Sequence, residues 1–454
     1  MDLATFLKLE LKNFLGRKAV LATVVCLLLA GVYGMFYGKN VLNNQAEIIT
    51  QVPKFQAEHF DKQLELNKDD LGNALYYLQH STIHEPSSWA AFSIGQRDVN
   101  PFIVKVSMLT LEGQLYDSEM SNPKNLLYGN FDLAFVFVFL FPLLIIAFCH
   151  NLISAEQESG VWNLLRSQPV SVRKIIGWRL LIRFVTVLLM SFGLIAASCF
   201  YHASAFDIRF SYALLIALVY LGFWFALTAF VISLEKSSIF NALSLLGVWI
   251  FLTILAPALL NLAISTALPV SESFELTIKQ REGYHQKWDK PKAVTMQLFY
   301  EKYPQYRDFP IPEDKFSWGW YYAAQYMGDL ESSDATANYL KKLELRDSWT
   351  NQAALLLPTV NTQMSFNRLS QNDLQGHLDY LASVRQFHTK LREHFYPFIF
   401  HNAKTEEVDW KKLPQHEFKD EKQKAKLPQT VFGVLAFAFL FGFAAWRNLR
   451  NLLS

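Results

Sequence analysis

Six long apolar blocks constrain the fold of this chain more than any other sequence feature. Hydrophobic residues make up 52% of the 454 residues, and many of them gather in runs of about twenty. A helix needs about that length to cross a hydrocarbon core of roughly 30 Å. The sequence therefore predicts an all-α polytopic membrane protein. Its six transmembrane helices are expected at residues 19–38, 132–150, 177–200, 212–234, 239–268 and 428–447.

Basic residues near the ends of the apolar blocks predict the orientation. Lys and Arg concentrate before the first block, between the second and third, and after the sixth. Short cytoplasmic loops carry such an excess. We therefore expect both termini inside the cell, together with residues 151–176, 235–238 and 448–454. Residues 39–131, 201–211 and 269–427 are expected outside.

The first and fifth blocks leave alternatives open. Residues 1–18 fit an amphipathic interfacial helix or a short cytoplasmic tail. The following block is longer than a signal-peptide core and lacks a small-residue cleavage site, which favours a signal anchor over a removed leader. The fifth block contains Pro257, which predicts a separate short helix over residues 257–268 at the outer face, either external or re-entrant.

The two long outer segments read as helical. Apolar residues at three- and four-residue spacing predict helices there. They are expected at residues 42–66, 71–79, 102–118, 272–286, 292–303, 318–346 and 374–396. The three cysteines, Cys26, Cys149 and Cys199, all fall in or beside apolar blocks. The outer domain is therefore expected to hold together by packing, without disulfides.

Chemical motifs are sparse. The chain has no phosphate-binding glycine loop, no His-Glu-x-x-His and no Cys-x-x-Cys, and a net charge of +2 argues against nucleic-acid binding. His80 and His84 stand four residues apart beside Glu85, which fits either a metal pair on one helical face or a solvated helix end. We predict no catalytic residue, no metal site and no cofactor bound by this chain.

The apolar blocks also lack the charged residues that could couple transport to an ion gradient. The second to sixth carry no Asp, Glu or Lys near their centres, and ion-coupled carriers usually need such residues. The polar exceptions in the fifth block are Asn241, Ser244 and Asn261, which could bond between helices or line a substrate path. Any active transport by this chain must draw its energy from a partner.

A charged connector joins the second and third blocks. Residues 154–160 read Ser-Ala-Glu-Gln-Glu-Ser-Gly, and residues 164–171 read Leu-Leu-Arg-Ser-Gln-Pro-Val-Ser. This amphipathic pattern is typical of a surface helix that a partner grips, or of a solvated loop capped by acids. The connector is the most specific motif of the chain.

The stretch around this connector resembles the core signature of type-2 ABC permeases (ABC-2 type), the membrane halves of bacterial exporters. The matching residues are Asp132, Phe135, Val136, Phe137, Pro142 and Leu143, then Ser154, Glu156, Glu158 and Gly160, then Leu164, Leu165, Ser167, Pro169, Val170 and Ser171. The resemblance implies a multi-pass protein of the bacterial inner membrane that pairs with a second permease chain. It also implies a cytoplasmic ATPase dimer, which binds the ATP and Mg.

The resemblance assigns the connector to ATPase coupling. Glu156 and Glu158 would offer charge to the ATPase, and an apolar anchor and turn would come from Gly160, Val161, Trp162, Leu165 and Pro169. The two long outer segments depart from typical members and resemble a subgroup with a large external insertion of unknown function. Two hypotheses follow: an exporter, or a mechanotransmission subunit whose motions act on an envelope protein through the outer domain.

Overall fold

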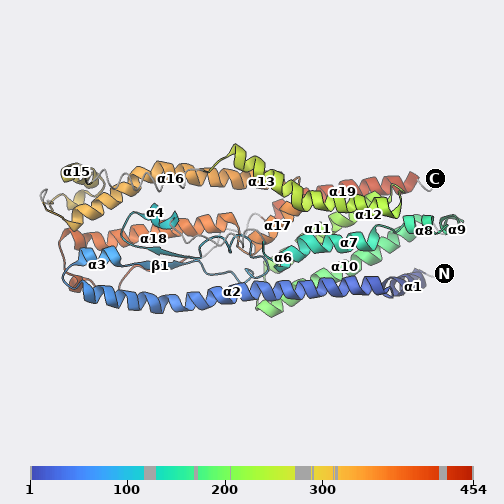
Figure 1. The fold of residues 1–454 in the computed structure, drawn as a ribbon, viewed down its shortest axis with the longest axis horizontal. Helices are drawn as coiled ribbons and strands as arrows, with labels where there is room; N and C mark the ends of the chain where they lie inside the picture. The colour runs from blue at the N-terminus through green and yellow to red at the C-terminus, as the bar shows by residue number, and fades with distance from the viewer. Residues whose placement is uncertain are drawn as a thin grey trace.

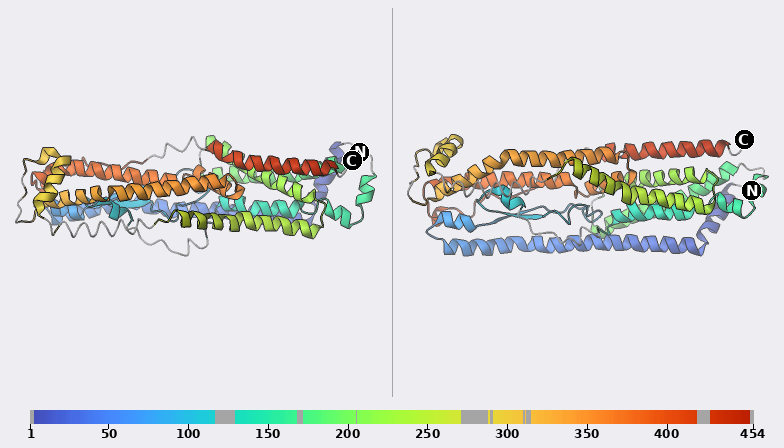
Figure 2. Two further views of the ribbon diagram at one scale, coloured as in Figure 1. Left: turned by 90° about the horizontal axis from the view of Figure 1, so that it is seen from above. Right: turned by 45° about the horizontal axis from the view of Figure 1, so that its top comes forward.

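The molecule is an elongated rod with its apolar helices in one half and a second helical region in the other (Figures 1 and 2). In this computed structural model the described residues are 3–116, 129–167, 172–204, 206–270, 288, 291–309, 311, 315–418 and 427–451. Both ends of the chain lie at the same end of the rod, next to the connector between the second and third apolar helices (Figure 1).

Among the described residues, six helices are long and apolar enough to cross a membrane, which agrees with a multi-pass membrane protein. We call them spans 1 to 6. Span 1 lies in α2 (Lys18–Leu66), and span 2 is the run of α6 (Leu133–Phe135), η1 (Val136–Leu140) and α7 (Phe141–Cys149). Spans 3 and 4 are α10 (Val172–His202) and α11 (Ile208–Ile232). Span 5 is the run of α12 (Ser238–Ile250), η2 (Phe251–Leu255) and α13 (Ala256–Ala267), and span 6 is α19 (Leu427–Asn451). The short α1 (Leu3–Leu15) precedes span 1.

Span 1 continues outward without a break. α2 has 49 residues and includes Pro53, so it is about 70 Å long, more than twice the thickness of a hydrocarbon core. Its glycines face the bundle: a Cβ on Gly34 would stand 2.9 Å from the backbone oxygen of Asp132. Glycine thus permits close approach of two backbones there. The segments predicted separately at 19–38 and 42–66 form one continuous helix.

Spans 2 and 5 each contain a π-helical turn beside a proline. η1 stands just before Pro142, and η2 just before Pro257. Such turns arise where one residue is inserted into the helical ladder. The chain does not turn back at Pro257, because α12, η2 and α13 follow one another in a single run. Of the two predicted forms of the short helix, the re-entrant one is therefore not seen, and α13 continues the direction of the span.

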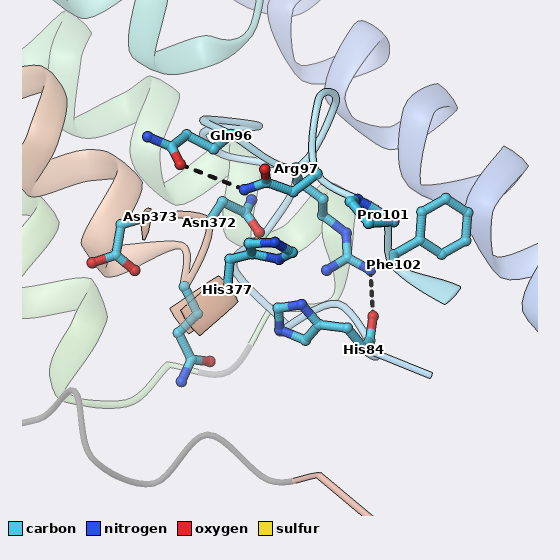
Figure 3. A pocket seen from close by; sticks show the side chains of 10 residues that line it. His84, Gln96, Arg97, Pro101, Phe102, Asn372, Asp373 and His377 are labelled. Carbon is cyan, nitrogen blue, oxygen red and sulfur yellow. Dashed lines mark hydrogen bonds between the residues drawn. The ribbon is translucent and has the colours of Figure 1, made fainter. Parts of the chain in front are cut away.

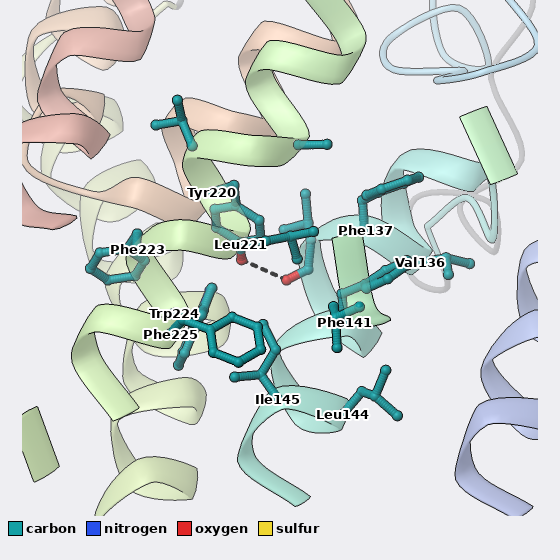
Figure 4. Close-up of a cluster of buried hydrophobic side chains, with 14 of the residues drawn as sticks. Val136, Phe137, Phe141, Leu144, Ile145, Tyr220, Leu221, Phe223, Trp224 and Phe225 are labelled. Carbon is teal, nitrogen blue, oxygen red and sulfur yellow. Dashed lines mark hydrogen bonds between the residues drawn. The ribbon is translucent and has the colours of Figure 1, made fainter. Parts of the chain in front are cut away.

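Spans 2 and 4 form the most buried part of the bundle. Phe137 and Phe141 of span 2 stack on one another, and they lie beside Tyr220 and Trp224 of span 4 (Figure 4). Asp132 caps the start of span 2: one carboxylate oxygen accepts from the Phe135 N–H and the other from the Ile94 N–H, each at 2.8 Å. This carboxylate ties the outer loop to the bundle.

The half of the rod that lies away from the connector and both termini has its own aromatic core, built mainly from helices. We call this half the outer domain. Its elements are α3 (Leu71–Tyr77), β1 (His80–Ile83), β2 (Ile103–Val106), α4 (Leu111–Tyr116), α15 (Lys292–Lys302), η3 (Pro304–Tyr306), α16 (Trp318–Ala354), α17 (Pro358–Leu369), α18 (Leu374–Phe400) and η4 (Thr405–Glu407). Two of the helices predicted here, α16 and α18, extend beyond their expected ends. The helix predicted at 272–286 lies outside the described residues.

A short antiparallel pair of strands adds a small sheet to the predicted, mainly helical outer region. β1 pairs with β2, with His80 opposite Val106 and Ile83 opposite Ile103. The helix predicted at 102–118 is therefore wrong over its first part, where β-branched Ile103, Val104 and Val106 pack as a strand. The chain is mostly helical with one two-stranded sheet among the described residues.

One outer helix belongs to the packing of the bundle. α17 contacts α11 and α19 at the outer ends of spans 4 and 6. Its Phe366 is buried in the same apolar cluster as the spans, against Phe137 of span 2. The outer domain and the spans therefore share a core at α17.

Candidate functional site

The connector between spans 2 and 3 consists of two very short helices. α8 (Ser154–Glu158) and α9 (Trp162–Arg166) are separated at Gly160, whose φ of 74° is a left-handed value that suits glycine. The connector therefore does not form the single surface helix that was one of its two interpretations, because this turn interrupts it. Pro169 lies outside the described residues.

Glu156 is bonded inside the chain. Its Oε1 accepts from Nη1 of Arg179 on span 3 at 2.8 Å. The same arginine and Arg183 stand 3.5 Å from the carboxylate of Glu10 on α1. Arg183 also donates to the Phe148 carbonyl at 3.0 Å. This charged cluster joins the N-terminal helix, the connector and span 3.

Glu158 is bonded to the start of span 5. Its carboxylate accepts from the Ser238 N–H at 2.7 Å and from the Ser238 hydroxyl at 2.9 Å. That hydroxyl also contacts the hydroxyl of Ser154, at 2.7 Å, and Gln157 donates to Glu235 at 3.1 Å. A carboxylate at a helix N-terminus satisfies an orphan N–H and complements the helix dipole. The two glutamates thus connect α8 to spans 3 and 5.

The apolar residues of the connector divide between two faces. Trp162 and Leu165 pack against the core of the spans. Val161 and Leu164 are 40% and 63% exposed. The outward apolar pair is therefore Val161 and Leu164. Leu164 belongs to the resemblance motif but was not predicted to take part in coupling. Its spacing of three residues from Val161 places both side chains on one face of a helix, and this spacing was the available signal.

The three polar residues proposed for span 5 do not form one site. Asn241 is buried, and its Nδ2 donates to the carbonyls of His150 at 3.1 Å and Lys236 at 3.3 Å. Asn241 therefore bonds between spans 5 and 2. Ser244 is half-buried one turn further along α12, and Asn261 is exposed on α13. The geometry gives no lined path through these residues.

His80 and His84, the two histidines considered as a metal pair, pack among aromatic rings. His80 lies in β1, not on a helix, and packs edge-on against Phe60 with ring centroids 5.0 Å apart. His84 stacks on Tyr380 at 4.9 Å. Among the described residues, no three His, Cys, Asp or Glu side chains could together hold a metal ion. The idea of a metal pair on one helical face is wrong, because this part of the chain is a strand.

A small pocket opens beside His84 (Figure 3). Arg97, Asn372, Asp373 and His377 are among the residues that line it. The Arg97 guanidinium donates to the His84 carbonyl at 2.7 Å and to Gln45 of α2 at 2.6 Å. Burial, helped by Arg97, lowers the pKa of His84 to about 3, and burial lowers the pKa of His377 to about 4. These imidazoles are neutral packing groups near pH 7.

The fold is mostly helical, and its six long apolar helices agree with a multi-pass membrane protein that carries a second, mainly helical domain beyond the spans. A family model described as "Domain of unknown function (DUF3526)" matches residues 274–419, which is less than half of the chain. The matched region contains α15, α16, α17 and α18. Comparison with curated proteins and with solved structures finds no match.

Proposed function

We propose that this chain is the membrane permease subunit of an ATP-driven ABC transporter of the ABC-2 type, and that the transporter is an exporter. The observation that carries the proposal is the connector at the end of the rod that also holds both termini. It offers an exposed apolar pair on a short turn and is anchored by its own acids to spans 3 and 5. A separate cytoplasmic ATPase would supply the energy.

The anchoring supports a coupling role. A partner that pushes on Val161 and Leu164 pushes on α9 and on the adjoining α8, and α8 is bonded to Arg179 of span 3 and Ser238 of span 5. A buried leucine at an interface contributes about 1.5–3 kcal/mol, and a few such residues dominate most interfaces. Glu156 and Glu158 then carry force to the spans, a different role from offering charge to the ATPase.

The remaining parts of the proposal concern partners and location. The transporter would contain two permease chains, identical or homologous, and an ATPase dimer that binds the ATP and Mg. The protein would lie in the inner membrane of a bacterial cell with both termini in the cytoplasm. The clustering of basic residues beside α1, the connector and the end of α19 supports this orientation.

A second candidate function rests on the outer half. α2 continues as one helix from the span to the far end of the outer domain, and α17 is packed between α11 and α19. A motion of the spans would therefore move the outer domain as well. This favours a mechanotransmission subunit that acts on an envelope partner without moving cargo, driven by the same ATPase.

Co-purification from native membranes tests the shared part of both candidates. The full-length chain should bring down an ATPase whose turnover rises in its presence, and Leu164→Glu should abolish both. Leu66→Glu is the matched control, because Leu66 is 67% exposed at the outer end of α2. An ATPase that remains bound and stimulated with Leu164→Glu would refute the assignment of the connector.

A further inference from the structure

The π-turn of span 5 leaves one backbone carbonyl without its helical donor. At the end of η2 the Ala256 N–H donates to the Phe251 carbonyl, five residues earlier. In the same register the next N–H would serve the Leu252 carbonyl, but residue 257 is a proline and has no N–H. A carbonyl in an apolar interior costs free energy unless it finds another donor.

An outer-domain side chain supplies that donor. The hydroxyl of Thr359, in the first turn of α17, donates to the Leu252 carbonyl. Thr359 is only 2% exposed, so water cannot easily replace it. α17 also contacts η2 directly. The bend of span 5 is therefore completed by a residue that lies more than one hundred positions later in the chain.

Span 2 also has a π-turn before a proline, but the carbonyls that side chains serve there lie four and three residues before the proline, not five. The Phe141 N–H donates to the Val136 carbonyl, five residues earlier, and residue 142 is a proline. The Val138 carbonyl, whose α-helical donor would be residue 142, accepts instead from the Tyr220 hydroxyl of span 4 at 2.7 Å (Figure 4). The next carbonyl, of Phe139, accepts from the Trp249 indole N–H at 3.0 Å. Trp249 lies in α12, two residues before η2, so the two π-turns are joined.

We propose that the two π-turns are a linked pair of proline hinges, latched by Tyr220, Trp249 and Thr359, and that Thr359 couples the hinge of span 5 to the outer domain. Helix bends are found at prolines and π-turns, and π-turns often mark functional sites. When span 5 changes its bend, the Leu252 carbonyl must either carry Thr359 and α17 with it or lose its donor. The device passes motion between the spans and the outer domain in either direction. It depends on these contacts alone and on no particular energy source.

A double-mutant cycle on the full-length chain in detergent tests the latch. Thr359→Val removes the hydroxyl at nearly constant size, and Pro257→Ala restores a backbone N–H that can serve the freed carbonyl. Hydrogen–deuterium exchange is followed at residues 251–256 and 359–364. Thr359→Val should speed exchange in both segments about fivefold, the factor expected for one hydrogen bond of ordinary net strength. In the Pro257→Ala background the same change should have an effect below about twofold.

A matched control separates the latch from general loosening of α17. Thr362 is also 2% exposed, but its hydroxyl donates to the Pro358 carbonyl of its own helix at 2.8 Å. Thr362→Val should leave residues 251–256 at the wild-type rate, and its effect on α17 should be the same with and without Pro257→Ala.

The second hinge provides an independent measurement. Tyr220→Phe should speed exchange at residues 136–141, and Pro142→Ala should suppress that effect. Equal effects of Thr359→Val with and without Pro257→Ala, or no change at residues 251–256, would overturn the latch at span 5. Variants that elute as wild-type in size-exclusion chromatography are compared, so that a misfolded chain is not read as an open hinge.

Discussion

Acidification should loosen the outer hairpin through one buried imidazole. His80 is 3% exposed, and its neighbours are the rings of Phe60, Phe387 and Phe395. Burial, with smaller contributions from His394 and His59, lowers its pKa from 6.5 to about 4. Because the folded pKa is depressed, the open state takes up a proton first as the pH falls.

The expected loss of stability follows from the ordinary pKa of His80 and from its lowered pKa in the folded protein. Stability is lost as the pH falls below about 6.5, and the loss stops near pH 4, where the folded form is protonated as well. Between pH 7 and pH 5 the contribution of His80 to the free energy of opening falls by about 2 kcal/mol. That is a large part of the stability of an ordinary domain.

The assay is amide exchange in the hairpin of the full-length chain. Opening free energies are obtained for residues 81–83 and 103–106 at both pH values, after correction for intrinsic exchange. His80→Leu should reduce the pH dependence by about 2 kcal/mol. His401→Leu, which changes an exposed imidazole after α18, is the control and should keep the wild-type dependence. A pH dependence that is the same in His80→Leu and in the wild type would refute the reasoning.

Two further predictions concern the outer domain and the topology. Asp329→Ala should destabilise the outer domain by about 3–5 kcal/mol, because it leaves the buried Arg392 guanidinium, 2.7 Å away, without its charge partner. Asp69→Ala, which breaks the exposed pair with Lys404, should cost less than about 1 kcal/mol, and equal losses in urea unfolding would contradict this. In a cysteine-free background, Glu58→Cys and Lys341→Cys should react with a membrane-impermeant thiol reagent in intact spheroplasts, whereas Ser159→Cys should not; labelling of Ser159→Cys alone would reverse the orientation.

The apolar helices were predictable because their signal is local. Runs of about twenty apolar residues can satisfy their backbone in lipid only as helices, so six spans follow from length and composition. The break at Pro257 was a natural inference from a missing N–H. In the structure the helix continues through a π-turn, and Thr359, a donor far along the chain, bonds the Leu252 carbonyl. No sequence pattern near residue 257 indicates the hydrogen bond between Thr359 and the Leu252 carbonyl.

In the outer domain, too, a tertiary contact decided a structure that the local sequence pattern left open. Residues 103–106 were read as helix because apolar residues recur at helical spacing over 102–118 as well as in alternation. Pairing with β1 decided in favour of a strand, and residues 84–102 separate the two strands in the sequence. Tertiary contacts override weak local preference in such short stretches. Long helices with a sustained pattern, such as α16 and α18, were recognisable despite uncertain ends.

The connector could be located from its sequence, but its faces could not. The acids, the glycine and the apolar residues marked a surface element between spans 2 and 3. The break at Gly160 and the inward direction of Trp162 depend on packing against the spans. The partners of Glu156 and Glu158 lie on spans 3 and 5, and side-chain pairs between helices leave no readable spacing in one sequence. The role of these residues toward an ATPase stays a prediction.

Site-specific photo-crosslinking tests the central proposal most directly. p-Benzoylphenylalanine is placed at position 164, which faces outward, or at position 165, which faces the spans, and cells are irradiated before membranes are prepared. We predict that position 164 gives an adduct whose partner is identified by mass spectrometry as an ABC ATPase, and that position 165 gives none. Absence of the ATPase from the adducts at position 164, in cells that produce both proteins, would contradict the proposed coupling site.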